Sequence, residues 1–133
     1  MEKKKVVRMT LDDIIKAKLQ KDQDKLTLKD IEIPSIGKSL RFRRPTRSEI
    51  CDFMDGITET NGQTEEVLEQ YQSLIYLCCD ELHQKDLFEQ LEIEDPESVV
   101  PAIMDDADIL AVGDEVASLN PLYKQYTEEE KNS

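Results

Sequence analysis

The longest regular pattern of apolar residues lies in the middle of the chain, from residue 65 to residue 84. Its apolar side chains recur at steps of three and four, which places them on one face of an α-helix. Thr64 precedes it as the expected N-cap. A helix this apolar, widened further by Leu77 and Cys79, must be covered on more than one side. We therefore expect residues 65–84 to be the central core helix, with an apolar face made of Val67, Leu68, Tyr71, Leu74, Ile75, Cys78 and Leu82.

Two runs with a period of two come earlier in the chain and predict a β-hairpin. The first run holds Leu26, Leu28, Ile31 and Ile33, and its broken step leaves open a β-bulge or two short strands. A turn signal with Pro and Gly at 34–38 follows. Leu40 and Phe42 then alternate with polar residues. We expect the apolar face to point inward and the face with Arg41 and Arg43 to point outward.

Helices are predicted on both sides of the hairpin. Thr10 and Asp13 predict a capped start for a short amphipathic helix over residues 11–21, followed by a polar break at 21–25. Its apolar stripe is narrow, so two placements stay open: packing on the domain or waiting for a partner. Thr46 and Glu49 form a second capping box. Further helical segments are expected at 50–57, 87–91, after Asp95-Pro96, and at 109–119.

The predicted fold class is α+β, with a small N-terminal β-hairpin or short antiparallel sheet packed on a mainly helical bundle of about four to five helices. An arm with the short helix would occupy residues 1–25, a single domain residues 26–120, and a flexible acidic tail residues 121–133. At 133 residues one domain is the expected number. No segment has the roughly 18 apolar residues of a membrane span, and no secretory signal is recognisable, so we expect a cytoplasmic protein.

Charge is distributed unevenly along the chain. The net charge is −13. Residues 1–50 hold 14 Lys and Arg against 8 Asp and Glu, a balance of +6, and residues 51–133 hold 3 against 22, a balance of −19. Such asymmetry predicts two electrostatically distinct surfaces or head-to-tail self-attraction. The acidic majority argues against nucleic acid or an anionic membrane as partner.

The residues that carry chemistry in enzymes and metal sites do not form recognisable patterns here. Cys51, Cys78 and Cys79 form no CxxC pair, and we expect them to be small core residues. His83 is the single histidine, which we expect to be solvated or capping. The acidic cluster at 105–108 does not match a calcium loop and suits a helix start. We therefore expect a non-enzyme with no catalytic residues, no metal and no cofactor.

Interaction is the remaining class of function. A basic cluster at the hairpin-to-helix junction either pairs with the acidic second half or binds an acidic partner. A small apolar patch in the tail either folds back on the domain or is a short binding motif. The candidate partner-binding residues are Arg41, Arg43, Arg44, Arg47, Leu122, Tyr123 and Tyr126.

The stretch IEIPSIGKSLRFRRPTRSEICDFMD resembles the opening of the tail assembly chaperones of Gram-positive phages and prophages, the XkdN-like group. That group typically has an Ile-Pro-x-Leu/Ile-Gly strand and turn, a second strand, and a Thr/Ser-x-x-Glu helix start. The matching positions are 33–37, 40–43 and 46–49, and the order of elements stays similar over residues 26–120.

This resemblance implies a non-enzymatic protein that binds the tape measure protein, helps recruit tail tube protein and is absent from the finished virion. Self-association is a further expectation from the charge asymmetry. Two other functions stay open: an acidic DNA mimic that inhibits a host nucleic-acid-binding protein, and a minor structural tail component.

Overall fold

The structure, a computed structural model, describes residues 6–125 and has the predicted α+β class. Within that range, none of the helices combines the length and apolar character needed to cross a membrane. The elements in chain order are α1 (Leu11–Lys25), β1 (Leu28–Ile33), β2 (Lys38–Arg43), α2 (Arg47–Glu59), α3 (Thr64–Leu77), the 3₁₀ helix η1 (Asp80–His83), α4 (Lys85–Gln90), the 3₁₀ helix η2 (Pro96–Ser98), α5 (Val99–Ile103) and α6 (Asp106–Ser118).

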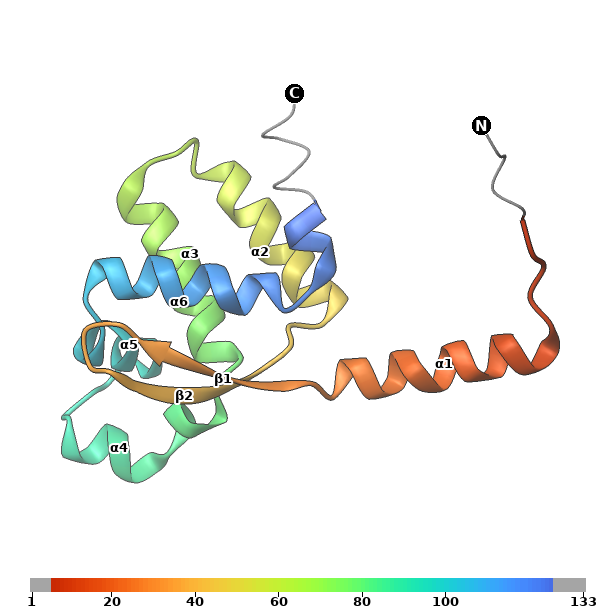
Figure 1. Cartoon of the computed structure of the whole chain (residues 1–133). Coiled ribbons are helices and arrows are strands. Elements are labelled where there is room, and N and C mark those ends of the chain that lie inside the picture. The colour runs from red at the N-terminus through yellow and green to blue at the C-terminus, as the bar shows by residue number, and fades with distance from the viewer. Residues whose placement is uncertain (1–5, 126–133) are drawn as a thin grey trace.

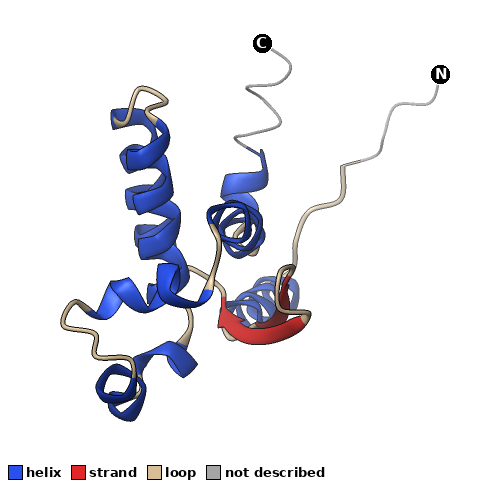
Figure 2. Ribbon diagram, turned by 90° about the vertical axis from the view of Figure 1, so that its left-hand side faces the viewer, coloured by secondary structure: helices blue, strands red, loops and turns tan. Residues whose placement is uncertain are grey.

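The helices α3 and α6 cross at the centre of the body, and the hairpin lies on the other side of α6 (Figures 1 and 2). In contrast, α1 extends away from the body on the side opposite α4 and α5 (Figure 1). One continuous core joins both strands to α2, α3, η1, α5 and α6. Its buried apolar side chains are Ile31, Ile33, Phe42, Ile50, Phe53, Leu74, Ile75, Cys78, Cys79, Leu82, Val99, Val100, Met104, Ile109, Val112, Val116, Ala117 and Tyr123.

The hairpin is regular, and its register pairs Leu28 with Arg43 and Ile33 with Lys38. A turn at 34–37 closes it, where Gly37 takes a positive φ of 74° that a side chain would disfavour. The side chain of Asp108, at the start of α6, accepts hydrogen bonds from the backbone N–H and hydroxyl of Ser35 in this turn. This contact fixes the hairpin against α6.

The expectation that Leu26 and Leu28 point inward is wrong. Leu26 lies before β1, and Leu28 lies on the outer face with Arg43, its partner in the register. Both leucines are exposed. The two-residue period holds from Leu28 onward without a bulge, which places Lys29 on the same face as Ile31 and Ile33. Ile31 is the first buried residue of the strand.

The central helix is shorter than the apolar period predicted. α3 begins after Gln63, which takes the N-cap position expected for Thr64, and ends at Leu77. Cys79 then takes an extended conformation, and the carbonyl of Cys78 accepts the backbone N–H of Arg43 at 2.9 Å. The carbonyl of Leu77 likewise accepts the Arg43 guanidinium, so the last carbonyl groups bond to β2 and the helix does not continue. Leu77 is 40% exposed, so it does not widen the core face.

The first helix is longer than predicted. The polar break expected at 21–25 is wrong, since α1 continues to Lys25. Side-chain pairs four residues apart support this polar end: Lys18 donates to Asp22 at 2.7 Å, and Gln20 donates to Asp24 at 2.9 Å.

The expected flexible tail is ordered in its first part. Residues 121–125 are helical, and Tyr123 is buried in the core. The sequence predicted a flexible tail here, whereas Tyr123 belongs to the core in the structure. Tyr126 and the remainder of the predicted tail lie outside the described residues.

Candidate functional site

The arm helix α1 projects from the body of the molecule (Figure 1). Its N-terminus is a complete capping box, in which Thr10 N–H donates to Asp13 at 2.9 Å and Asp13 N–H donates to Thr10 Oγ1 at 3.1 Å. The helix is therefore locally defined, yet none of its residues is buried. The sequence left open whether this helix packs on the domain or waits for a partner. In the structure it does not pack on the domain.

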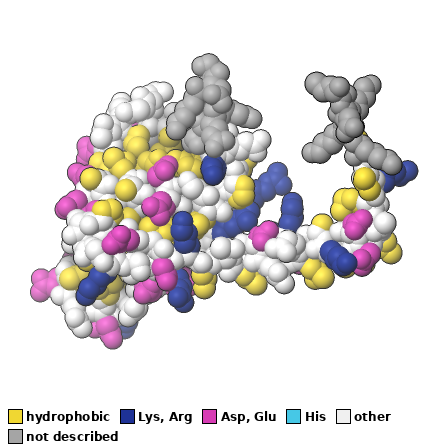
Figure 3. All heavy atoms as spheres, in the orientation of Figure 1, with side chains coloured by type: hydrophobic (Ala, Val, Ile, Leu, Met, Phe, Trp, Pro, Cys, Tyr) yellow, Lys and Arg dark blue, Asp and Glu magenta, His cyan; other side chains and the backbone are white. Residues whose placement is uncertain are grey.

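Four large aliphatic side chains form one stripe on α1. At about 100° per residue, the stripe follows one side of the helix for roughly 12 Å. At least half of each side chain is exposed to solvent. In Figure 3 apolar side chains are visible along the projecting arm. The members of this stripe are Leu11, Ile14, Ile15 and Leu19.

One flank of the stripe is basic. Lys18, Lys21 and Lys25 follow each other at steps of three and four, beside Ile14. Among residues 6–125, no ion pair reaches Lys21 or Lys25, and the pair that Lys18 makes with Asp22 is largely exposed. Exposed ion pairs contribute little to stability, so the lysines of this flank can bind carboxylates of a partner instead.

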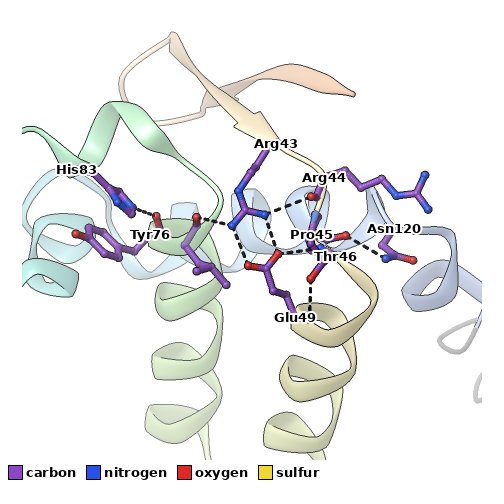
Figure 4. A network of polar contacts seen from close by, with 9 residues as sticks. Arg43, Arg44, Pro45, Thr46, Glu49, Tyr76, His83 and Asn120 are labelled. Atoms are coloured by element: carbon purple, nitrogen blue, oxygen red, sulfur yellow. Dashed lines mark hydrogen bonds and ion pairs between the residues drawn. The ribbon is translucent and has the colours of Figure 1, made fainter. Parts of the chain in front are cut away.

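The predicted basic cluster divides into two parts, and the first part is satisfied internally. Arg41 donates to Asp30 across the hairpin at 3.0 Å. Arg43 donates to both oxygens of Glu49, at 2.7 and 2.8 Å, and to the carbonyl of Leu77 at 3.1 Å. Figure 4 shows Arg43 between Glu49 and the end of α3. It therefore joins β2, α2 and α3, which is a structural role.

The electrostatics of this pair follow from its geometry. The Arg43 guanidinium, together with the backbone N–H of Thr46, lowers the pKa of Glu49 to about 2. The same contact raises the pKa of Arg43. Bidentate Arg–carboxylate pairs are among the stronger charged hydrogen bonds, and this one is only partly exposed.

The second part of the cluster, Arg44 and Arg47, has no ion pair within residues 6–125. Arg47 is exposed and Arg44 is half-buried. The neighbouring backbone is nevertheless fixed, because Asn120 donates to the carbonyl of Pro45 at 3.1 Å (Figure 4). Of the four arginines predicted to bind a partner, these two have guanidinium groups without a carboxylate in the described structure.

The predicted tail patch is likewise divided. The ring of Tyr123 packs against the ring of Phe53, and its hydroxyl donates a hydrogen bond to Asp114 at 2.7 Å. The Tyr71 hydroxyl forms a second hydrogen bond with the Tyr123 hydroxyl, at 3.2 Å. Burial raises the pKa of Tyr123. Leu122 is 41% exposed. The structure therefore favours folding back on the domain for Tyr123, whereas Leu122 remains accessible.

A groove that the sequence did not predict lies between α3 and the α5–α6 segment. Its volume is about 520 Å³, and its lining residues include no Lys or Arg. Figure 3 shows apolar side chains between α3 and α6, with acidic side chains beside them. We call this surface the acidic groove. Its lining contains the apolar residues Leu68, Pro101 and Ile109, the acidic residues Glu65, Glu69 and Asp106, and the uncharged polar residues Thr64 and Gln72.

His83, Cys78 and Cys79 are each in contact with neighbouring groups or buried. His83 stacks on Tyr76 with ring centroids 4.1 Å apart, and its Nε2 lies 2.6 Å from the Tyr76 carbonyl oxygen. Cys78 and Cys79 are buried, as expected, and burial raises their pKa values to about 12 and about 11. Among residues 6–125, no three His, Cys, Asp or Glu side chains are arranged to hold a metal ion.

Comparison with family models, with curated proteins and with solved structures gave no match to this chain. The geometry itself is thus the basis for a functional proposal. The sequence pattern identified the α1 stripe but gave no reason to choose it over the arginines as a binding surface. It could not identify the acidic groove, whose lining residues are up to 45 positions apart, from Thr64 to Ile109.

Proposed function

We propose that this chain is a non-enzymatic tail assembly chaperone of a phage or prophage, which acts in the cytoplasm of the bacterial host. It would bind the tape measure protein and assist assembly of the tail tube. The observation that carries this proposal is α1, a capped helix of 15 residues with no buried residue and an exposed aliphatic stripe.

The segments that resemble the XkdN-like group have coherent places in the fold. The Ile33–Gly37 segment forms the end of β1 and the turn, Leu40–Arg43 lies in β2, and Thr46 with Glu49 caps α2. These residues position the hairpin and α2. They are packing elements, so the resemblance assigns no contact residues.

The chemistry of α1 suits a tape measure protein, which we take to be a long helical protein that aggregates when unassembled. An amphipathic helix recognises another helix by burying side chains at steps of three and four. The net charge of −13 would keep the complex soluble.

The test is co-expression with the tape measure gene, followed by pull-down and measurement of soluble tape measure protein. Wild type should keep it soluble, and Ile15→Asp/Leu19→Asp should not. The matched control is Ala17→Asp/Gln20→Asp, which adds the same charge to the opposite face of α1. Tape measure protein that stays insoluble with wild type, or that the stripe variant keeps equally soluble, would contradict the proposal.

The same preparations distinguish the other two functions. A DNA mimic would bind a basic host protein with a steep dependence on salt concentration and leave the tape measure protein insoluble. A structural tail component would be present in purified virions.

A further inference from the structure

We propose that the stripe of α1 docks into the acidic groove of a second copy of this chain, so that copies join head to tail. This inference concerns the protein alone and goes beyond the proposed function. One side of the interface would be the aliphatic stripe of α1 with its basic flank. The other side would be the acidic groove between α3 and the α5–α6 segment.

The two surfaces are complementary in both polarity and charge. The stripe offers exposed aliphatic side chains, and the groove offers apolar lining residues. Lys18, Lys21 and Lys25 on the flank match a lining with the carboxylates of Glu65 and Glu69 and no cation. Such complementarity favours association and sets the orientation of the helix in the groove.

The α1 helix is directed away from the groove of its own chain. Only Leu26 and Thr27 separate α1 from β1. Thr27 is fixed on both sides, because its carbonyl accepts Arg44 N–H at 3.2 Å and its hydroxyl donates to Asp24 O at 2.7 Å. The helix therefore extends on the side opposite α5, where the groove lies (Figure 1). Docking within one chain would require these contacts to break, whereas docking on a second copy leaves them intact.

An interface between two different surfaces has a defined consequence for assembly. Each copy has one helix and one groove, so the product is a reciprocal dimer, a larger ring or an open chain, depending on the rotation that relates neighbouring copies. One short helix buries less surface than a standard stable interface. We therefore expect association to increase with protein concentration and to weaken with salt. Self-docking would also cover the stripe until a client protein displaces it.

The test uses sedimentation velocity on the purified full-length protein over a wide range of concentration. Wild type should form dimers or larger species as the protein concentration rises. The arm variant Ile15→Asp/Leu19→Asp and the groove variant Glu65→Lys/Glu69→Lys should each be monomeric. Since none of these four residues is buried, folding should be unaffected, and circular dichroism checks this.

The decisive experiment mixes the two variants. The arm variant keeps an intact groove and the groove variant keeps an intact helix, so the mixture should form a one-to-one dimer and nothing larger. The controls Ala17→Asp/Gln20→Asp and Glu89→Lys/Glu94→Lys, which change exposed residues elsewhere, should assemble like wild type.

Three results would overturn the proposal. Wild type that stays monomeric at every concentration would do so, as would a mixture that forms no dimer. A groove variant that assembles like wild type, while the arm variant does not, would show that α1 pairs with another surface. All three measurements lack the tape measure protein, so their failure is distinguishable from failure of the proposed chaperone function.

Discussion

Removing the negative charge of Glu49 tests whether the Arg43 contact holds three segments together. The carboxylate accepts two hydrogen bonds from Arg43, which also reaches the last turn of α3 at Leu77. The variant Glu49→Gln keeps the shape of the side chain and an oxygen that can accept the N–H of Thr46. It removes the charge that pairs with Arg43.

The size of the expected loss in free energy of unfolding follows from the lowered pKa of Glu49. A fall from 4.5 to about 2 corresponds, at about 1.36 kcal/mol for each pH unit, to an upper limit of roughly 3.4 kcal/mol. The two side chains are 32% and 22% exposed, so solvent screening reduces this value. We expect Glu49→Gln to lower the free energy of unfolding by about 1–2 kcal/mol at pH 7.

The pH dependence has a definite sign. Because the pKa is lower in the folded state, the stabilisation is complete above pH 4.5 and is lost as pH falls through about 2. Urea unfolding at pH 7 and pH 3 should therefore show a gap between wild type and variant that shrinks to less than half. The control Glu89→Gln changes an exposed carboxylate and should show almost no gap. Equal stability of Glu49→Gln and wild type at pH 7, or a gap that is unchanged at pH 3, would refute the reasoning.

Three further substitutions test the packing of the body by urea unfolding. Ile75→Ala removes a fully buried side chain and should cost about 2–5 kcal/mol; a loss under about 1 kcal/mol would show that α3 is not central. Tyr123→Phe loses the hydrogen bond to Asp114 and should cost about 1 kcal/mol, whereas no change would indicate that residues 121–125 do not dock. Gly113→Ala places a methyl group against the ring of Tyr71 and should cost about 1–3 kcal/mol, and a stabilised variant would contradict this close approach of α3 and α6.

The starts of α1 and α2 and the hairpin were predictable because they depend on residues close in sequence. A capping box needs only a hydroxyl and a carboxylate three positions apart, and both Thr10 with Asp13 and Thr46 with Glu49 form it. The hairpin needs an alternating pattern and a turn signal, and Gly37 in that turn takes a positive φ.

Helix ends were predicted less well, since they depend on contacts between distant segments. The apolar period continues past Leu77, but the carbonyl groups of Leu77 and Cys78 bond to Arg43, which lies more than 30 positions earlier. At the other end of the chain, Tyr123 is a lone aromatic residue in a polar stretch. Only the pocket beside Phe53 and Tyr71 explains its burial.

The candidate binding surfaces divide in the same way. The sequence by itself determined that α1 is a capped amphipathic helix with a narrow stripe, because periodicity and capping are local properties. Only the tertiary structure decided that no other element within residues 6–125 covers that stripe, that Arg43 is paired with Glu49, and that an acidic groove lies between α3 and the α5–α6 segment. Burial, pairing and grooves depend on which distant residues meet, and no local pattern specifies that.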